Sequence, residues 1–310
     1  MKYISETTEF KLNNSVVTLG KFDGLHKGHQ LLINHILELK KKGYLSVVFT
    51  FSLHPSNLFF DKDKELIYTE KEKKHKIEQL GLDVLVAYPF VKETACMEPE
   101  DFIKEVLVEK LDAKVIVVGK DFRFGHHRRG DVAMLKTLSV KYGYEVVAYD
   151  KLSQDGEIIS SSRIKEELSN GNMEKVNGML GSPFSIMGEV LHGRKIGRTL
   201  GMPTTNLLPL DHKLLPPNGV YASMTRVDNK EYHSVTNIGY KPTVGAENKK
   251  GVETYIIDYD NDLYGKEIEI LLYSYERGEE KFDSLEELKQ CMYKDIAYAK
   301  QYFEIDERTL

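Results

Sequence analysis

The first half of the chain alternates short, almost wholly apolar runs with longer amphipathic stretches, and this alternation constrains the fold more than any other feature. The apolar runs are rich in β-branched residues and span residues 15–19, 45–51, 84–88, 114–118 and 145–149. Strands that are apolar nearly throughout are typical of a sheet that is covered on both faces. The pattern therefore predicts five buried, mostly parallel strands.

The stretches between these runs have the apolar spacing of helices, at about residues 30–42, 70–80, 98–111 and 131–142. Three of them end at a glycine, which relieves the left-handed strain at a helix C-terminus: Gly43, Gly81 and Gly143. The lysine-rich parts of this region, residues 40–42 and 71–76, are interpreted as solvated helix faces. Repeated strand–helix–strand order predicts an α/β doubly wound, Rossmann-like domain.

After about residue 160 the pattern changes to short alternating strands separated by many turns. Two short helical stretches, 163–169 and 173–179, precede a break at Gly181-Ser182-Pro183. The strands expected beyond it are 184–191, 219–227, 232–238, 253–259 and 267–272. This pattern favours an antiparallel β-barrel followed by a C-terminal helix at 284–303, capped by Ser284 with Glu287 three residues on. We therefore predict two domains, residues 1–183 and 184–310.

Length, charge and cysteine content exclude several classes of protein. The 310 residues suffice for two domains that each bury a core. The net charge of −5 argues against a dedicated nucleic-acid binder, and no apolar run approaches the length of a membrane span. Cys96 and Cys291 lie in separate halves, which excludes a disulfide framework and a cysteine-based zinc site. With no signal peptide visible, we expect a cytoplasmic protein without nucleic-acid or membrane partners, and the sequence does not indicate an oligomeric state.

A glycine- and histidine-rich segment, GKFDGLHKGH at residues 20–29, follows the first predicted strand and opens a helix. Such a turn presents free amide N–H groups and the positive end of the helix dipole to an anion. His26 and His29 are three residues apart, so both can donate hydrogen bonds to the same triphosphate. A tight turn with two surface histidines is the alternative. A zinc pair is less favoured, because no third ligand lies nearby.

The HxGH turn resembles the signature of nucleotidyltransferases that activate their substrates with ATP. The longer string GKFDGLHKGHQ resembles the adenylyltransferase module of bacterial bifunctional riboflavin kinase/FAD synthetases. The further matching segments are Thr50-Phe51 with His54-Pro55, residues 118–125, Gly130-Asp131 and residues 159–165. The resemblance implies that this half joins FMN to AMP from ATP, with His26 and His29 as catalytic groups.

The same resemblance implies the binding residues of this half. Those expected to bind the nucleotide are Gly20, Phe22, Asp23, Gly24, Gly28, Ser161, Ser162 and Lys165. Those expected to bind the flavin are Asp121 and Phe122. The chain departs from the family pattern at Ser162 and Lys165, where threonine and arginine are usual, and at Ser52-Leu53, where an acidic residue and proline are common.

A second dense motif, GEVLHGRKIGRTLGMPTTN, covers residues 188–206. Thr204 and Asn206 are two apart on an extended segment, so their side-chain oxygens share one face and suit Mg²⁺ that bridges ATP phosphates. A plain barrel turn is the alternative for the glycines. The string resembles the GxxxxGxxxGRxLGxPTxN signature of riboflavin kinase. That resemblance implies a metal site at Thr204 and Asn206 and nucleotide contacts at Gly188, Gly193, Gly197 and Arg198.

The remaining riboflavin kinase motifs follow in order: residues 219–221, 237–239 with Pro242-Thr243, Glu253-Thr254 with Asp258, residues 264–266, and Arg277-x-Glu279-x-Lys281-Phe282. By resemblance, Glu253 is the general base that takes the proton from the ribityl 5′-hydroxyl of riboflavin. A carboxylate near Mg²⁺-ATP is chemically apt for that task. Arg277 and Glu279 are implied to contact the flavin.

Two independent signatures, in the right order and a domain apart, predict a bifunctional enzyme that uses ATP to convert riboflavin to FMN and FMN to FAD, with Mg²⁺ as cofactor. One alternative is a riboflavin kinase whose adenylyltransferase half is weakened, given Ser162, Lys165 and Ser52-Leu53. Another is a non-catalytic flavin-binding regulator, against which the intact base and metal residues argue. An adenylyltransferase acting on nucleic acid is disfavoured by the negative charge and the lack of an aromatic–basic stripe.

Overall fold

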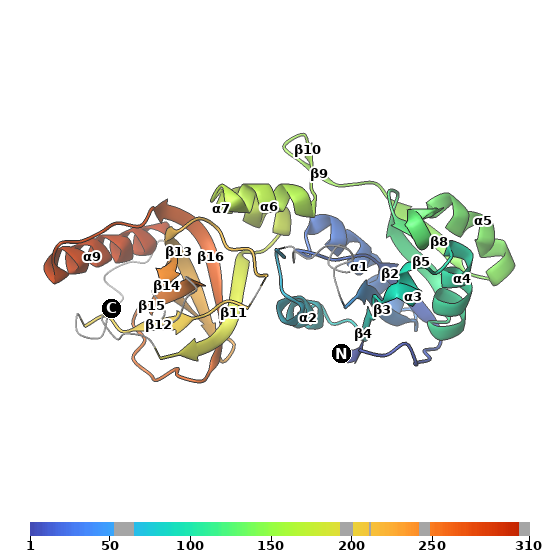
Figure 1. The fold of residues 1–310 in the computed structure, drawn as a ribbon, viewed down its shortest axis with the longest axis horizontal. Helices are drawn as coiled ribbons and strands as arrows, with labels where there is room; N and C mark the ends of the chain where they lie inside the picture. Colours follow the sequence, from blue (N-terminus) through green and yellow to red (C-terminus); the bar gives the residue numbers. More distant parts are fainter. Residues whose placement is uncertain (53–64, 193–200, 211, 242–248, 304–310) are drawn as a thin grey trace. The chain divides into compact units, whose positions relative to one another are not determined.

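The computed structural model of the protein describes residues 1–52, 65–192, 201–210, 212–241 and 249–303 (Figure 1). The chain divides into two compact units, Met1–Ser161 and Ser162–Leu310. Each unit contains one of the two architectures that the sequence predicts. Within the described ranges, no helix is long and apolar enough to cross a membrane.

The first unit is built on a six-stranded parallel sheet with the order β1-β4-β3-β2-β5-β8 (Figure 1). Its strands are β1 (Lys2–Ser5), β2 (Ser15–Leu19), β3 (Leu45–Phe51), β4 (Val84–Tyr88), β5 (Ala113–Gly119) and β8 (Glu145–Tyr149). Five of these confirm the predicted strands. The edge strand β1, which pairs with β4, was not predicted.

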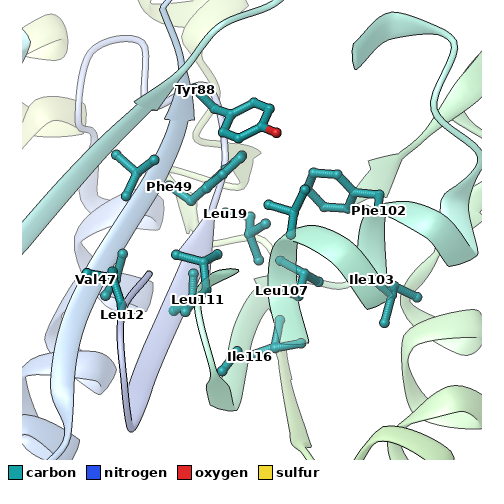
Figure 2. Packing of buried hydrophobic residues seen from close by; sticks show 14 of the residues in the cluster. Leu12, Leu19, Val47, Phe49, Tyr88, Phe102, Ile103, Leu107, Leu111 and Ile116 are labelled. Atoms are coloured by element: carbon teal, nitrogen blue, oxygen red, sulfur yellow. The ribbon is translucent and has the colours of Figure 1, made fainter. Parts of the chain in front are cut away.

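Helices cover both faces of this sheet, as the apolar strands require. The helices are α1 (Lys27–Lys40), α2 (Glu70–Gln79), α3 (Lys92–Ala95), α4 (Pro99–Asp101), the π-helix η1 (Phe102–Lys110) and α5 (Val132–Tyr142). On one face, Phe102, Ile103 and Leu107 of η1 pack against strand residues such as Phe49 and Ile116 (Figure 2). On the other face, α1 and α2 pack against alternate residues of the same strands. The helix predicted at 98–111 is therefore a short α4 followed by a π-helix.

Smaller elements complete the first unit: β6 (Arg123–Phe124), η2 (His126–Arg128), β7 (Gly130–Asp131), β9 (Ser153–Gln154) and β10 (Glu157–Ile158). The three glycines predicted to end helices all have positive φ: Gly43, Gly81 and Gly143. The chain runs from β2 to β3 and β4, then crosses to β5 on the other side of β2. In parallel α/β sheets, ligands bind at the carboxyl ends of the strands where the order reverses in this way. Here that place lies at the ends of β2 and β5.

The second unit is a closed antiparallel barrel with the order β11-β12-β15-β14-β13-β16 (Figure 1). Its strands are β11 (Phe184–Leu191), β12 (Thr204–Leu207), β13 (Gly219–Val227), β14 (Lys230–Lys241), β15 (Lys249–Ile256) and β16 (Glu267–Arg277). The barrel confirms the predicted architecture, and four of the predicted strands coincide with or lie inside observed ones. The strand predicted at 253–259 lies earlier, because β15 ends at Ile256.

Helices α6 (Ser161–Ser169), α7 (Met173–Leu180) and α9 (Leu285–Tyr302) accompany the barrel. Inside the barrel, the hydroxyl groups of Ser223, Ser234 and Thr236 form buried hydrogen bonds of 2.8–2.9 Å with one another and with neighbouring threonines. On the outside, α9 packs against Val235, Tyr255 and their neighbours. Ser284 caps α9 by accepting a hydrogen bond from the backbone N–H of Glu287, as predicted.

Candidate active sites

The turn after β2 has an unusual backbone that is held in place by burial. Phe22, Gly24 and Leu25 have φ values of 51°, 89° and 47°, in the left-handed region. Two of the three carry side chains, so the conformation costs energy unless the surroundings enforce it. Phe22 and Leu25 are 0% and 3% exposed and pack with the α1 side of the core. The turn is therefore anchored by its apolar side chains, while its backbone leads into α1.

The two histidines of the turn stack on each other at the start of α1. Their ring centroids are 3.7 Å apart with an interplanar angle of 17°. His26 is the N-cap residue of α1, and its Nδ1 accepts a hydrogen bond from the backbone N–H of His29 at 3.3 Å. A Cβ atom added at Gly28 would lie 3.1 Å from Cε1 of His26. Any larger residue there would push against the His26 ring, which explains the glycine between the histidines.

Burial keeps both imidazoles neutral at physiological pH. It lowers the pKa of His26 to about 4. It also holds the pKa of His29 well below its ordinary value, with further contributions from the neighbouring His26 and Lys73. A neutral imidazole carries one N–H. Because Nδ1 of His26 accepts a hydrogen bond, its proton is on Nε2, which is then available as a donor.

Asp23 ties this turn to two other segments of the first unit. Its carboxylate Oδ1 accepts a hydrogen bond from the backbone N–H of Ile67 at 2.9 Å. Its backbone carbonyl accepts one from Oγ of Ser161 at 2.8 Å. Asp23 and Ser161, both predicted nucleotide-binding residues, thus meet at the turn. Ser162 and Lys165 follow on α6 in the second unit, and Gly20 directly follows β2, where its N–H donates to the carbonyl of Phe49.

The two predicted flavin-binding residues of the first unit, Asp121 and Phe122, follow β5, the strand next to β2. They therefore lie at the same edge of the sheet as the histidine turn. Phe122 is half-buried and stacks on Phe124 with ring centroids 5.6 Å apart, so part of its ring belongs to the core. Asp121 is exposed and forms an ion pair with Lys151 at 2.9 Å.

In the barrel, strand register brings predicted residues of separate motifs together. Asn206 of β12 lies opposite Glu253 of β15, and Glu253 lies opposite Asn237 of β14. Val235 and Tyr255, two residues along the same strands, lie beneath α9 on the outside of the barrel. Because side chains alternate between the faces of a strand, Asn206, Glu253 and Asn237 also belong to the outer face. Thr204 shares this face with Asn206.

The row of register partners continues from Asn237 through Val220 of β13 to Arg277 of β16. Arg277 donates two hydrogen bonds to Asp295 of α9, at 2.8 Å from Nε and 2.7 Å from a terminal nitrogen. This bidentate pair raises the pKa of the guanidinium further above its ordinary value. Arg277 is therefore held by α9 beside the row.

Glu279 lies close to this row of register partners. Its carboxylate lies directly over Gly239, where a Cβ atom would collide with it. It also accepts a hydrogen bond from the side-chain amide of Asn218 at 2.9 Å. Gly239 is two residues from Asn237 on β14, so Glu279 covers the outer face next to the Asn206–Glu253–Asn237 row.

Of the nucleotide-binding residues predicted in the barrel half, only some belong to the part of the chain that the structure describes. Gly188 lies within β11, opposite Ile268 of β16, rather than in a loop. Gly193, Gly197 and Arg198 lie outside the described residues, as do His54-Pro55 and Pro242-Thr243 of the family motifs.

Three residues at these sites received no role from the sequence: Lys73, Asn237 and Asp295. Asn237 stood inside a recognised motif, but only the strand register places it beside Glu253. Asp295 is one of several acidic residues on α9, and its pairing with Arg277 depends on how the helix packs. The lysine-rich pattern of residues 71–76 predicts a solvated helix face for Lys73, whereas its side chain is only 7% exposed.

The first unit has a turn of the phosphate-binding type at the switch point of a parallel sheet. The second unit has a row of amide and carboxylate side chains on a barrel. These features define the class of nucleotide-dependent transferases, with one candidate site in each unit. Comparison with known proteins gives the particular family. The FAD synthetase family model matches residues 8–163, and the riboflavin kinase family model matches residues 180–303.

Curated relatives match both units at once. The bifunctional riboflavin kinase/FMN adenylyltransferase of Buchnera aphidicola is 40% identical over 94% of this chain and 95% of that protein. The Bacillus subtilis and Escherichia coli K12 proteins of the same name are 38% and 35% identical, each over 93% of this chain and 92% of their own. The chain belongs to the bifunctional riboflavin kinase/FMN adenylyltransferase family. Its two activities are those in the family's name, which confirms the predicted family and function.

Among solved structures, a protein from Streptococcus pneumoniae described as a macrolide-efflux protein has the same fold throughout. It superposes with a TM-score of 0.85 at 28% identity, covering 96% of this chain and 98% of the other.

Proposed function

We propose that FMN adenylylation takes place at the histidine turn of residues 20–29, and riboflavin phosphorylation at the Asn206–Glu253–Asn237 row on the barrel. The observation that carries this proposal is that the chain has two separate polar centres, one in each compact unit. Each centre contains residues suited to one of the two reactions.

In the adenylylation step, a phosphate oxygen of FMN attacks the α-phosphorus of ATP, and the bond to the β-phosphate oxygen breaks to release pyrophosphate. The FMN phosphate is already ionised at neutral pH, so no strong base is needed. His26 and His29, neutral and stacked, donate N–H groups to the charge that grows on the phosphoryl oxygens. Neutral donors of fixed orientation suit this role, because they need no reorganisation during the reaction.

In the kinase step, the ribityl 5′-hydroxyl of riboflavin attacks the γ-phosphorus of ATP, and ADP leaves. Glu253 accepts the hydroxyl proton as the new P–O bond forms. Asn206 and Asn237 lie opposite Glu253 on the two neighbouring strands. We assign them to orienting that carboxylate and to offering amide groups to the substrates.

The donor set next to Glu253 fits a magnesium ion. Mg²⁺ prefers hard oxygen ligands and is usually held by a few protein oxygens together with substrate phosphates. The Thr204 hydroxyl and the Asn206 amide oxygen share the outer face of β12, two residues apart, and Asn206 is 9% exposed. We assign these two residues to the metal. When bound, Mg²⁺ would neutralise charge on the ATP phosphates.

We further assign Arg277 and Glu279 to the flavin in the kinase site, and Asp121 and Phe122 to the flavin in the adenylyltransferase site. Phe122 offers an aromatic face beside the edge of the sheet. We assign nucleotide contacts to the remaining predicted residues, including Ser162, Lys165 and Gly188. The proposal also includes a domain boundary at residues 183/184, a cytoplasmic location, and small molecules as the only partners.

A second candidate function is that of a riboflavin kinase with a weakened adenylyltransferase half. Ser162 and Lys165 favour it, because they stand where threonine and arginine are usual in the family. Lysine keeps the charge of arginine but loses its planar, bidentate fork.

A product assay tests the proposal: the full-length protein is incubated with riboflavin, ATP and Mg²⁺, and the flavins are separated by chromatography. We expect FMN to appear first and FAD to accumulate afterwards. A reaction that stops at FMN would favour the weakened form.

A further inference from the structure

Lys73 is a buried lysine on α2, a helix with several lysines. Its side chain is 7% exposed, whereas Lys71, two residues earlier on α2, is exposed. The interpretation of residues 71–76 as a solvated face is therefore wrong for Lys73. Burying an ammonium group is unfavourable unless it meets negative charge, so a buried lysine calls for a specific reason.

The face of α2 that carries Lys73 is held against the histidine turn. Ile77, one helical turn after Lys73, is fully buried in the same core cluster as Phe22 and Leu25 of the turn. Just before α2, the backbone N–H of Ile67 donates to the carboxylate of Asp23. These two attachments, one on each side of Lys73, fix its place on α2 beside residues 20–29.

The charge of Lys73 reaches the histidines. Its positive charge is one of the influences that lower the pKa of His29, after burial and the neighbouring His26. Its ion-pair partner is Glu70, 2.7 Å away, whose side chain is 41% exposed. The other nearby carboxylate of α2, Glu72, is engaged in the capping box with Thr69. A partly solvated glutamate can release the ammonium to a stronger anion when one binds.

We propose that Lys73 is a phosphate-binding residue of the adenylyltransferase site, whose ammonium group contacts phosphoryl oxygens of ATP or FMN bound at the histidine turn. This inference rests on the proposed role of residues 20–29. A lysine suits the task because it is a compact point charge with three donors. It adds a full positive charge where the neutral histidines supply only hydrogen bonds.

The test compares four variants in the full-length protein: Lys73→Met, Lys73→Arg, Glu70→Gln and, as the matched control on the exposed side of α2, Lys71→Met. FAD formation from supplied FMN is followed while ATP and FMN are varied in turn. Loss of one charge-assisted contact predicts a fall of about 10- to 100-fold in kcat/KM for Lys73→Met. Whichever substrate shows the raised KM is the one whose phosphate Lys73 contacts. Glu70→Gln and Lys71→Met should stay within a few-fold of the wild type, and Lys73→Arg, which keeps the charge but not the compact shape, should lose less activity than Lys73→Met.

Riboflavin kinase activity and the melting temperature of each variant report folding. If Lys73→Met does not fold, Lys73→Gln replaces it, and inhibition by inorganic pyrophosphate gives a second measure of phosphate binding. Unchanged kinetics and pyrophosphate inhibition in a folded Lys73 variant would overturn the proposal. So would an equal loss in Glu70→Gln, because that result would make the ion pair merely structural. His29→Ala distinguishes failure of the proposed adenylylation site from failure of the proposed role of Lys73. If His29→Ala retains FAD formation, the assignment of residues 20–29 fails. If His29→Ala loses FAD formation and Lys73→Met retains it, only the role of Lys73 fails.

Discussion

Single residues acquire their chemistry here from neighbours that are distant in sequence. Glu253 is half-exposed on a barrel strand, and apart from the family resemblance its segment does not distinguish it from other strand glutamates. The register sets it between two asparagines, Asn206 and Asn237. His26 and His29 are close in sequence, but their neutral state comes from burial by the surrounding core.

Glu253 and Asn206 should fail in different ways if their proposed roles are right. Glu253→Gln keeps the size of the side chain but cannot accept a proton, so kinase turnover should fall by about 10²–10⁴-fold with little change in ATP binding. Asn206→Ala should weaken binding of the metal–nucleotide and recover partly when Mg²⁺ is raised. Steady-state kinetics over a magnesium series checks both. Near-normal turnover of Glu253→Gln, or its rescue by magnesium, would show that Glu253 is not the base.

The lowered pKa of His26 should make stability depend on pH. In the unfolded chain His26 takes up a proton below about pH 6.5, whereas in the folded protein it does so only near pH 4. The unfolded state therefore binds more protons between these values, and stability falls as the pH falls through this window. Between pH 7 and pH 5 the loss from His26 alone is about 2 kcal/mol. Urea unfolding of the wild type and His26→Gln at both pH values should show a smaller loss in the variant; equal losses would contradict the assignment.

At the scale of elements, the apolar periodicity predicted most of the structure, and its failures have physical causes. The runs at 45–51 and 84–88 form strands because both faces are buried, which their sequences show directly. The edge strand β1 and the polar strand β12 become strands only by pairing with β4 and with β11 and β15. The π-helix η1, where the N–H of Leu111 reaches back to the carbonyl of Val106, has the same apolar spacing as an α-helix.

The residues of the candidate sites likewise divide into those that the sequence predicts and those that depend on the folded structure. Sequence motifs and resemblance supplied His26, His29 and Glu253, because each belongs to a recognisable string. Lys73 and Asp295 could not be found in this way, since their significance depends on which side of a helix is covered in the folded protein.

Helix α9 should influence the kinase site through the Arg277–Asp295 pair. Asp295 is 4% exposed and is the bidentate partner of Arg277. Asp295→Asn removes the negative charge and leaves a half-buried guanidinium poorly compensated, which should cost about 2–4 kcal/mol of stability. We expect a lower melting temperature and a raised KM for riboflavin, with FAD formation from supplied FMN unchanged. Glu286→Gln, an exposed change on the same helix, is the control. A wild-type KM for riboflavin in Asp295→Asn would remove Arg277 from the flavin site.

For the whole molecule, the structure divides the chain at Ser161/Ser162, whereas the sequence places the domain boundary after Pro183. The difference concerns helix α7, whose Asn177 accepts a hydrogen bond from the backbone N–H of Phe184 at 2.8 Å. Its side-chain amide also donates to the carbonyl of Leu272 at 2.9 Å. Helix α7 therefore belongs to the barrel by its contacts, and the boundary at 183/184 stays a prediction.

Two fragments test this boundary. We expect residues 184–310 to phosphorylate riboflavin, because the proposed kinase residues all lie within them. Residues 162–310 should do the same with a higher melting temperature, since α7 buries Val176, Met179 and Leu180. Thermal unfolding and kinase assays of both fragments provide the comparison. A folded 162–310 fragment without kinase activity would mean that the kinase site needs the first unit.

If the two proposed sites are chemically independent and act in series, one product assay on full-length variants will separate them. Full-length wild type, His29→Ala and Glu253→Gln are each given riboflavin or FMN with ATP and Mg²⁺, and the flavins are separated by chromatography. His29→Ala should convert riboflavin to FMN at the wild-type rate but form FAD about 10²–10³-fold more slowly. Glu253→Gln should form almost no FMN from riboflavin, yet convert supplied FMN to FAD normally. If either change lowered both reactions equally while the melting temperature stayed the same, the two activities would share a site, which contradicts the proposal of two independent sites.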